Sequence, residues 1–160
     1  MTTPFSAALS IAAVLALSGA AVADESVYLG KFEGGWSGTG QVRLMAGAPM
    51  VTVTCTLAGD AVGQTLELKG KCGGGMINTS VSASMKFDPR HGGYVGTWRT
   101  SGTNAGLVGK RLGNRIHLAV RESGEPGRRL TLSVQGRRMN FTMHRTDDRA
   151  KVMTLALNRS

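Results

Sequence analysis

The fold of this chain is decided by residues 50–57, whose sequence is Met-Val-Thr-Val-Thr-Cys-Thr-Leu. The apolar set Val51, Val53, Cys55 and Leu57 alternates there with three threonines. Successive side chains of a β-strand point to opposite faces, so the alternation gives one apolar and one polar face. β-Branched residues suit a pleated surface, and a one-sided apolar set fixes the register of pairing. The stretch therefore predicts a strand with one face in a core.

The same period of two recurs along the rest of the chain. Glycine makes up 23 of the 160 residues, and glycine-rich turns separate short alternating segments. Strands are predicted over residues 41–45, 50–57, 66–72, 77–87, 94–100, 106–110, 116–121, 130–134, 139–143 and 152–157. One apolar face per strand favours antiparallel neighbours over parallel ones. We therefore predict an all-β fold of eight to ten strands, a small antiparallel barrel in preference to a two-sheet sandwich, with no further helix.

The first 23 residues have the features of an export signal. They carry no Asp, Glu, Lys or Arg, and an apolar stretch runs from Ala7 to Leu17. An A-x-A cleavage pattern follows at residues 21–23. The alternative is an uncleaved membrane anchor, but the composition is less apolar than is usual for a spanning helix. We predict a signal peptide over residues 1–23 and one periplasmic or secreted domain over 24–160, without a transmembrane span.

The two cysteines, Cys55 and Cys72, lie 17 residues apart and both fall on the apolar faces of predicted strands. An even number of cysteines in an exported chain favours a disulfide. We expect the bond to join neighbouring strands that are linked around Gly59-Asp60; a pair of buried free thiols is the alternative. No metal site is predicted, because the chain has no C-x-x-C pair and its histidines lie far away in sequence.

Charge is distributed unevenly along the chain. Residues 24–85 hold four basic and five acidic residues, whereas residues 86–160 hold fifteen basic and five acidic ones. A cationic half attracts polyanions such as anionic lipid, acidic polysaccharide or nucleic acid. Nucleic acid is disfavoured, because the basic half offers few aromatic side chains for base stacking. The alternative is that these arginines only solvate the outer strand faces.

Two tryptophans follow a glycine at the same spacing, in Gly34-Gly35-Trp36 and in Gly96-Thr97-Trp98. With the general rhythm of the strands, this Gly-x-Trp pattern resembles the small secreted ligand-binding barrels of the lipocalin and avidin type. The resemblance implies that a tryptophan plugs one end of a barrel. Trp36 and Trp98 are therefore expected to be structural residues at the barrel ends.

Aromatic residues make up only 5% of the chain, so the methionines bear most on whether the barrel interior is open or packed. Flexible methionines can form an adaptable apolar lining, but they also fill cores. Small barrels can be packed solid with side chains. The residues concerned are Met76, Met85, Met139, Met143 and Met153. Core filling is the simpler interpretation, and the sequence leaves open whether the interior holds a ligand.

No catalytic motif of the G-x-S-x-G, H-E-x-x-H or phosphate-loop type is present. We therefore predict a non-catalytic binding protein without a cofactor, whose basic half docks an anionic lipid or polysaccharide of the cell envelope. Its contacts are assigned to Arg128, Arg129, Arg137 and Arg138, which flank one predicted strand. Two other classes stay open: a barrel-type inhibitor or accessory factor that binds a protein, and an enzyme with an unrecognised site.

Overall fold

The structure, a computed structural model, describes residues 15–123 and 127–160, with side chains described from residue 21 onward. The described part contains one helix and ten strands. Their bounds are α1 Leu15–Gly30, β1 Gly34–Val42, β2 Val51–Val62, β3 Thr65–Gly74, β4 Ile77–Asp88, β5 Gly93–Thr100, β6 Thr103–Leu112, β7 Arg115–Arg121, β8 Arg128–Gln135, β9 Arg138–Arg145 and β10 Lys151–Arg159.

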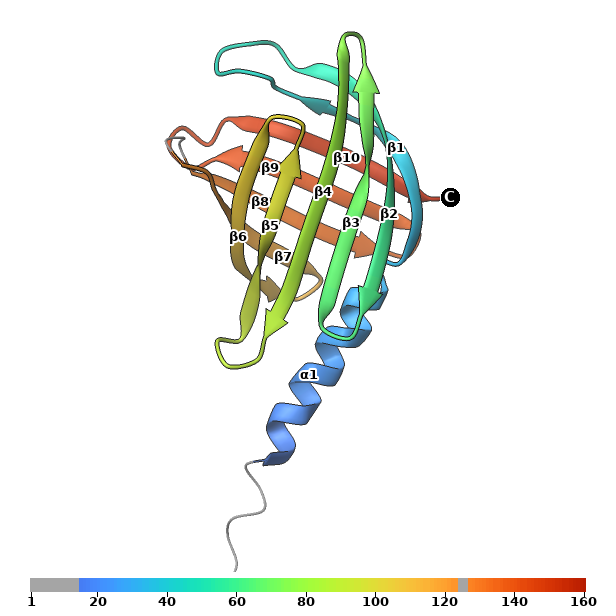
Figure 1. Cartoon of the computed structure of the whole chain (residues 1–160), viewed down its shortest axis with the longest axis vertical. Coiled ribbons are helices and arrows are strands. Elements are labelled where there is room, and N and C mark those ends of the chain that lie inside the picture. Colours follow the sequence, from blue (N-terminus) through green and yellow to red (C-terminus); the bar gives the residue numbers. More distant parts are fainter. Residues whose placement is uncertain (1–14, 124–126) are drawn as a thin grey trace, which may run out of the picture.

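The strands form one closed antiparallel barrel (Figure 1). Each strand pairs with the next along the chain, and β10 returns to pair with β1, which places Trp36 opposite Arg159 and Val42 opposite Met153. A closed barrel leaves no strand edge unpaired. The prediction of an all-β antiparallel fold, with a barrel preferred to a sandwich, is confirmed.

Two strand ends differ from the sequence prediction. β1 begins at Gly34 and not at residue 41 as predicted, so the Gly34-Gly35-Trp36 stretch lies inside the first strand instead of before it. β2 runs on to Val62, and the chain turns at Gly63, whose φ of 57° is in the left-handed region, instead of around Gly59-Asp60. The left-handed conformation at Gly63 is one that glycine adopts without steric penalty, which is why the turn falls there.

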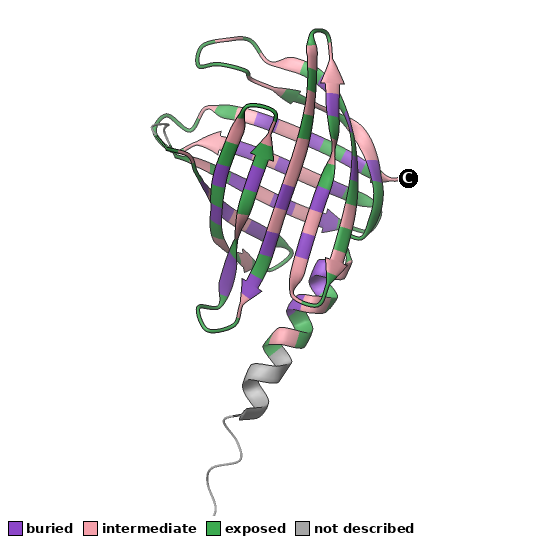
Figure 2. Ribbon diagram, in the orientation of Figure 1, coloured by how far each residue is buried: buried purple, intermediate pink, exposed green. Residues whose placement is uncertain are grey.

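The helix α1 closes one end of the barrel. Tyr28 and Leu29 from its last turn, together with Phe32 just after it, are buried against the strands. Figure 2 shows this buried part of α1 beside the lower end of the barrel, and buried positions alternating along the strands. The expectation of no helix beyond residue 23 was wrong, because seven residues of α1 lie past that point and serve as a plug. No helix in residues 15–123 and 127–160 is long and apolar enough to cross a membrane.

The two ends of the barrel are therefore different. We call the end covered by α1 the closed end; the turn at Gly63 lies there. The open end is the opposite one, where the connections at residues 43–50, 75–76, 101–102 and 146–150 lie.

The plug rests directly on the backbone of β2. A Cβ atom added at Gly59 would lie 1.9 Å from the carbonyl oxygen of Phe32, which is far shorter than the contact distance of the two atoms. The same carbonyl accepts a hydrogen bond from Nε1 of Trp36 at 2.9 Å. Gly59 is therefore the position where the absence of a side chain lets the plug dock.

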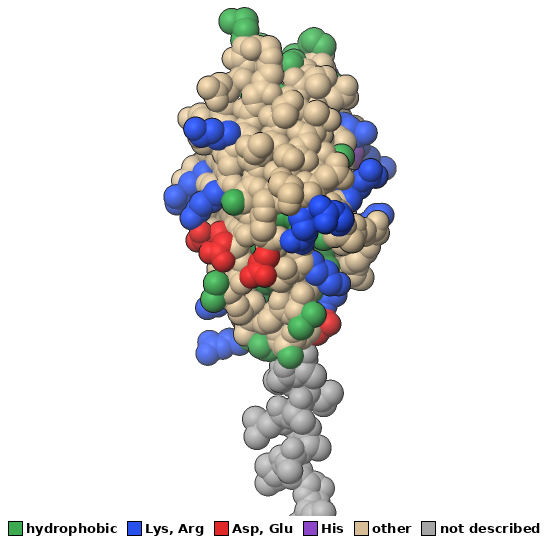
Figure 3. Space-filling view, turned by 90° about the vertical axis from the view of Figure 1, so that its right-hand side faces the viewer, with side chains coloured by type: hydrophobic (Ala, Val, Ile, Leu, Met, Phe, Trp, Pro, Cys, Tyr) green, Lys and Arg blue, Asp and Glu red, His purple; other side chains and the backbone are tan. Residues whose placement is uncertain are grey.

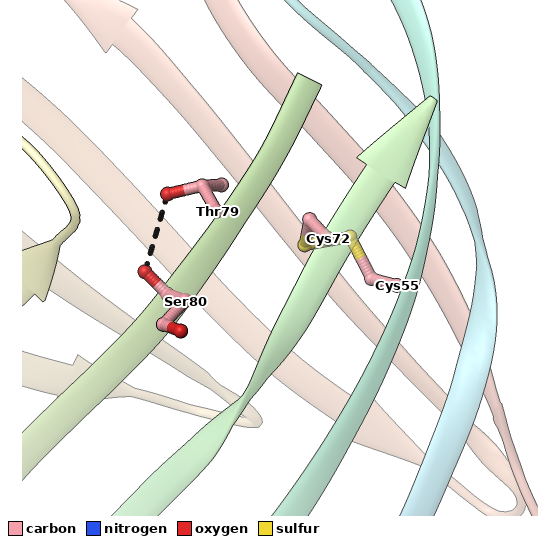
Figure 4. Close-up of a disulfide and its surroundings, with 4 residues drawn as sticks. All are labelled: Cys55, Cys72, Thr79 and Ser80. Atoms are coloured by element: carbon pink, nitrogen blue, oxygen red, sulfur yellow. Dashed lines mark hydrogen bonds between the residues drawn. A yellow bond between two sulfur atoms is a disulfide. The ribbon is translucent and has the colours of Figure 1, made fainter. Parts of the chain in front are cut away.

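The disulfide ties β2 to β3. Cys55 and Cys72 are directly opposite in the pairing of these strands, and their Cα atoms are 4.1 Å apart. Both side chains are buried on the inner side of the barrel. Figure 4 shows the bond reaching across the two strands, with β4 alongside. The predicted Cys55–Cys72 disulfide is present in the structure.

Replacing both cysteines, as Cys55→Ala with Cys72→Ala, should lower the free energy of unfolding by about 3 kcal/mol, because a loop of this size is no longer closed in the unfolded chain. Denaturant titration of the variant against the parent measures the difference. Titration of the unreduced parent with a thiol reagent should find no free thiol. Two reactive thiols in the native protein would contradict the assignment.

Replacing Gly59 with Ala should destabilise the protein by about 1–3 kcal/mol, since the new methyl group must displace the Phe32 carbonyl or bend β2. Gly106→Ala is the matched control, because a Cβ atom at this strand position has no heavy atom nearer than 4.0 Å. Thermal melting of the two variants makes the comparison. Equal melting temperatures would show that the plug does not depend on this contact.

Candidate functional site

The interior of the barrel has a packed half and a hollow half. Near the closed end, large side chains that include Trp36, Leu66, Met85 and Tyr94 are buried in the interior. In the other half the barrel encloses a cavity of about 270 Å³ that reaches the open end. The interior thus differs between its halves: core residues lie at the closed end, and the cavity lies toward the open end.

The walls of the cavity are mostly apolar. Inward-facing residues of β2, β3, β4, β5 and β9 form them. These residues are Val53, Leu57, Leu68, Val81, Ala83, Trp98, Phe141 and Met143. β10 adds Met153 and Leu155. Such a lining removes apolar ligand surface from water and offers it few polar partners.

The two tryptophans occupy different places. Trp36 lies under the plug, and the guanidinium of Arg159 sits 4.5 Å from its ring centre. Trp98 lies in the cavity wall, opposite Ala83 on β4 and Ala105 on β6, and these small neighbours leave room for the indole. Trp98 is thus a residue that a ligand in the cavity would touch.

Polar groups gather where the cavity meets the open end. Thr79, Thr100 and Thr103 line it at the ends of β4, β5 and β6. Arg128 enters from β8, on the same face as the buried Leu130, and forms an ion pair with Glu122. The cavity therefore changes from apolar to polar toward its mouth.

A second hollow of about 370 Å³ adjoins the mouth. It is lined by Arg43, Arg128 and Arg145, and it shares Arg43, Leu44, Arg128 and Val152 with the cavity. We call this hollow the three-arginine vestibule. Guanidinium groups bind carboxylates and phosphates through charge-assisted, often bidentate hydrogen bonds.

The arginines of the vestibule have different partners. Arg145 pairs with Asp147 and lies 3.5 Å from Asp148, and its hydrogen bond holds the pKa of Asp147 well below the usual range. Arg43 donates to two backbone carbonyls, from Nε to Lys151 at 3.3 Å and from Nη1 to Ala48. Among residues 15–123 and 127–160, no carboxylate forms an ion pair with Arg43, so its positive charge is not neutralised by a described acidic residue.

A second charged cluster, at the closed end, serves the plug. Arg111 faces inward from β6 and pairs with Asp24 and Glu25 of α1, while the hydroxyl of Tyr94 donates to the buried Glu25 carboxylate. Burial raises the pKa of Tyr28 to about 12, and burial together with the hydrogen bond to Glu25 also raises the pKa of Tyr94. These groups satisfy one another, so the cluster fixes the plug and offers no open site.

The four arginines assigned from the sequence lie at two ends of the barrel. Arg128 and Arg129 are at the open end, opposite Arg145 and His144 in the pairing of β8 with β9. Arg137 and Arg138 are in the β8–β9 turn region at the other end, where Nη2 of Arg137 donates to the carbonyl of Arg159 at 3.2 Å. They therefore cannot form a single binding surface.

Sequence reasoning missed Arg43 and the three threonines of the mouth. A usable signal was present, because Thr79 has the same strand parity as Val81 and Ala83, and Thr100 has the parity of Trp98. A hydroxyl at an inward position near a strand end indicates where a barrel interior becomes polar.

Comparison with known proteins supports the fold. No family model matches the chain, and none of the curated proteins matches it. Among solved structures, the chain is similar to the crystal structure of Rv2717c from M. tuberculosis, with a TM-score of 0.66 and 12% sequence identity, covering 85% of this chain and 97% of that chain. At this identity the likeness shows the barrel fold alone. The resemblance to lipocalins and avidins stays a prediction.

Proposed function

We propose that this protein is an exported, non-catalytic binding protein whose barrel holds a small apolar molecule with one anionic end. The observation that carries the proposal is the continuity of the apolar cavity with the three-arginine vestibule. In this proposal, the anionic group expected from the sequence binds inside the mouth of the barrel instead of along its outer surface. The inhibitor and enzyme alternatives stay untested predictions.

The size and lining of the cavity favour a slender apolar ligand. Its volume of about 270 Å³ is just below the roughly 300–1,000 Å³ usual for small-molecule pockets. Burial of an alkyl chain is favourable by about 25 cal/mol for each Å² of apolar surface removed from water. Met143 and Met153 can adapt their flexible side chains to the shape of an alkyl group.

The vestibule favours an anion at the outer end of the ligand. Arg43 brings a charge that its two hydrogen bonds do not neutralise, and Thr100 and Thr103 can donate from hydroxyl groups nearby. Arg128 is already paired with Glu122, so a ligand anion would have to share this guanidinium or displace the carboxylate. Competition with Glu122 for Arg128 lowers the affinity for the anionic ligand. An uncharged ligand cannot compete with the carboxylate at all.

Three features support export with removal of residues 1–23. The segment has the composition of a signal peptide, and the disulfide is of a kind that persists in oxidising compartments. Among helix residues 21–30, Asp24 is the first that forms an ion pair with the barrel, through Arg111. Cleavage after Ala23 would therefore keep every one of the plug contacts described above.

Decanoate should bind the protein more tightly than decanol, since both place an alkyl chain in the cavity but only decanoate has a carboxylate for the vestibule. Calorimetric titration measures both affinities. Val81→Trp, which fills the cavity, should abolish both. Arg128→Met combined with Glu122→Gln should weaken decanoate by about tenfold, the effect of losing one charge-assisted hydrogen bond, and leave decanol unchanged.

Arg137→Met, at the closed end, is the matched control for that experiment and should bind like the parent. Decanoate binding that survives Val81→Trp would place the ligand outside the barrel and overturn the proposal.

Protein recovered from the exporting cell should begin at Asp24, because small residues at positions 21 and 23 fit the A-x-A cleavage pattern. N-terminal sequencing or intact mass makes the measurement. Ala21→Arg with Ala23→Arg should leave the full-length precursor. A membrane-retained parent that still carries residues 1–23 would show that the segment is an anchor.

A further inference from the structure

The open end of the barrel carries exposed apolar side chains on two neighbouring tips. Leu44 and Met45, in the β1–β2 connection, have 63% and 71% of their surface exposed, and Met76, at the β3–β4 turn, is fully exposed at 104%. β2 pairs with both β1 and β3, so the two tips lie next to each other on the rim. Figure 1 shows both projecting beyond the strands, and Figure 3 shows apolar side chains at that extreme of the molecule. The expectation that Met76 fills the core was wrong.

Basic residues lie at the same end of the barrel as these tips. Arg129, His144, Arg145 and Arg149 line a shallow hollow of about 500 Å³ on the outside of the barrel beside the vestibule. The carboxylates of Asp147 and Asp148 face Arg145. The surface thus combines projecting apolar residues with arginines, and it borders the mouth of the cavity at the β1–β2, β3–β4 and β9–β10 connections.

A combination of exposed apolar and cationic side chains fits the interface of an anionic bilayer. Apolar residues of such surfaces enter the boundary between headgroups and acyl chains, while Lys and Arg bind the anionic headgroups. Flexible methionines can adapt to a fluid, irregular partner. An acidic polysaccharide would use the arginines but would gain nothing from Leu44, Met45 and Met76.

We infer that the open end docks onto an anionic lipid bilayer, with Leu44, Met45 and Met76 inserted and Arg129 and Arg149 against the headgroups. The inference rests on the proposed function and names the bilayer as the source of its ligand. In this orientation the cavity mouth faces the membrane. An amphiphile can then move from the acyl layer into the barrel with its anionic end passing the three-arginine vestibule.

The closed end provides a matched comparison, because it also exposes apolar residues. Leu112, at the β6–β7 turn, is 67% exposed, and Val62, at the β2–β3 turn, is similarly exposed. Acidic residues of α1, Asp24 and Glu25, lie at this end, and the cavity does not reach it. Serine substitutions at either end therefore remove exposed apolar surface, at different distances from the mouth.

The test is co-sedimentation with vesicles of phosphatidylcholine, with or without an equal part of phosphatidylglycerol. The parent should bind the anionic vesicles and release them in high salt, where exposed charges are screened. Leu44→Ser, Met45→Ser and Met76→Ser together should weaken binding by about tenfold or more. The control pair Val62→Ser and Leu112→Ser should bind like the parent.

A charge variant tests the headgroup contacts separately. Arg129→Gln with Arg149→Gly should weaken binding by about fivefold for each arginine removed. Glycine suits position 149, because Arg149 has a φ of 58° that glycine adopts without strain. Thermal melts of all variants confirm that each one is folded.

Vesicle-free titration with decanoate separates this inference from the proposed function. If the parent binds decanoate but the tip and control variants sediment equally with vesicles, docking is overturned and the ligand site stands. If the parent does not bind decanoate, the proposed function fails, and the bilayer as source of its ligand fails with it. Retention of the parent on a heparin matrix without binding to anionic vesicles would replace the bilayer by a polysaccharide.

Discussion

The pairing of β1 with β10 is the constraint on which the rest of the structure depends. It joins the first strand to the last, so every strand has two neighbours and the sheet has no free edge. Closure also creates an interior of limited size, to which each strand contributes alternate residues. The two halves of the molecule then differ in what fills this interior.

At one end the interior is filled by a segment from outside the sheet. Tyr28, Leu29 and Phe32 supply apolar volume, and Glu25 supplies the carboxylate that an inward-facing Arg111 requires. Arg111 is partly buried, and loss of its carboxylate partners would leave its charge uncompensated there, so the barrel and its plug are adapted to each other. No second segment fills the open end among the described residues, and the cavity and vestibule are the result.

Much of the fold could be predicted from strand periodicity, because a one-residue shift would move an apolar set such as Val51, Val53 and Cys55 out of the core. The disulfide could be predicted from the same parity. The start of β1 could not, because Gly38 and Gly40 disfavour a strand locally; a Cβ atom at either would lie 2.1 Å from a carbonyl oxygen of β10. That requirement is visible only once the barrel is closed. The candidate site could be predicted in part. The charge of Arg128 indicates an anion contact, whereas its place at a cavity mouth depends on tertiary structure.

The closure of β1 on β10 also sets the order of events when the chain is made. Trp36 and Arg159 come from opposite ends of the sequence, and contacts between such distant residues form late because a long loop must close first. Until β10 has been synthesised, one edge of β1 has no partner, and an unpaired edge can join other chains into aggregates. β1 holds four glycines among its nine residues, which makes it a weak strand when it stands alone. The glycine content that lets β1 approach β10 so closely thus also keeps the nascent chain from pairing with the wrong neighbour.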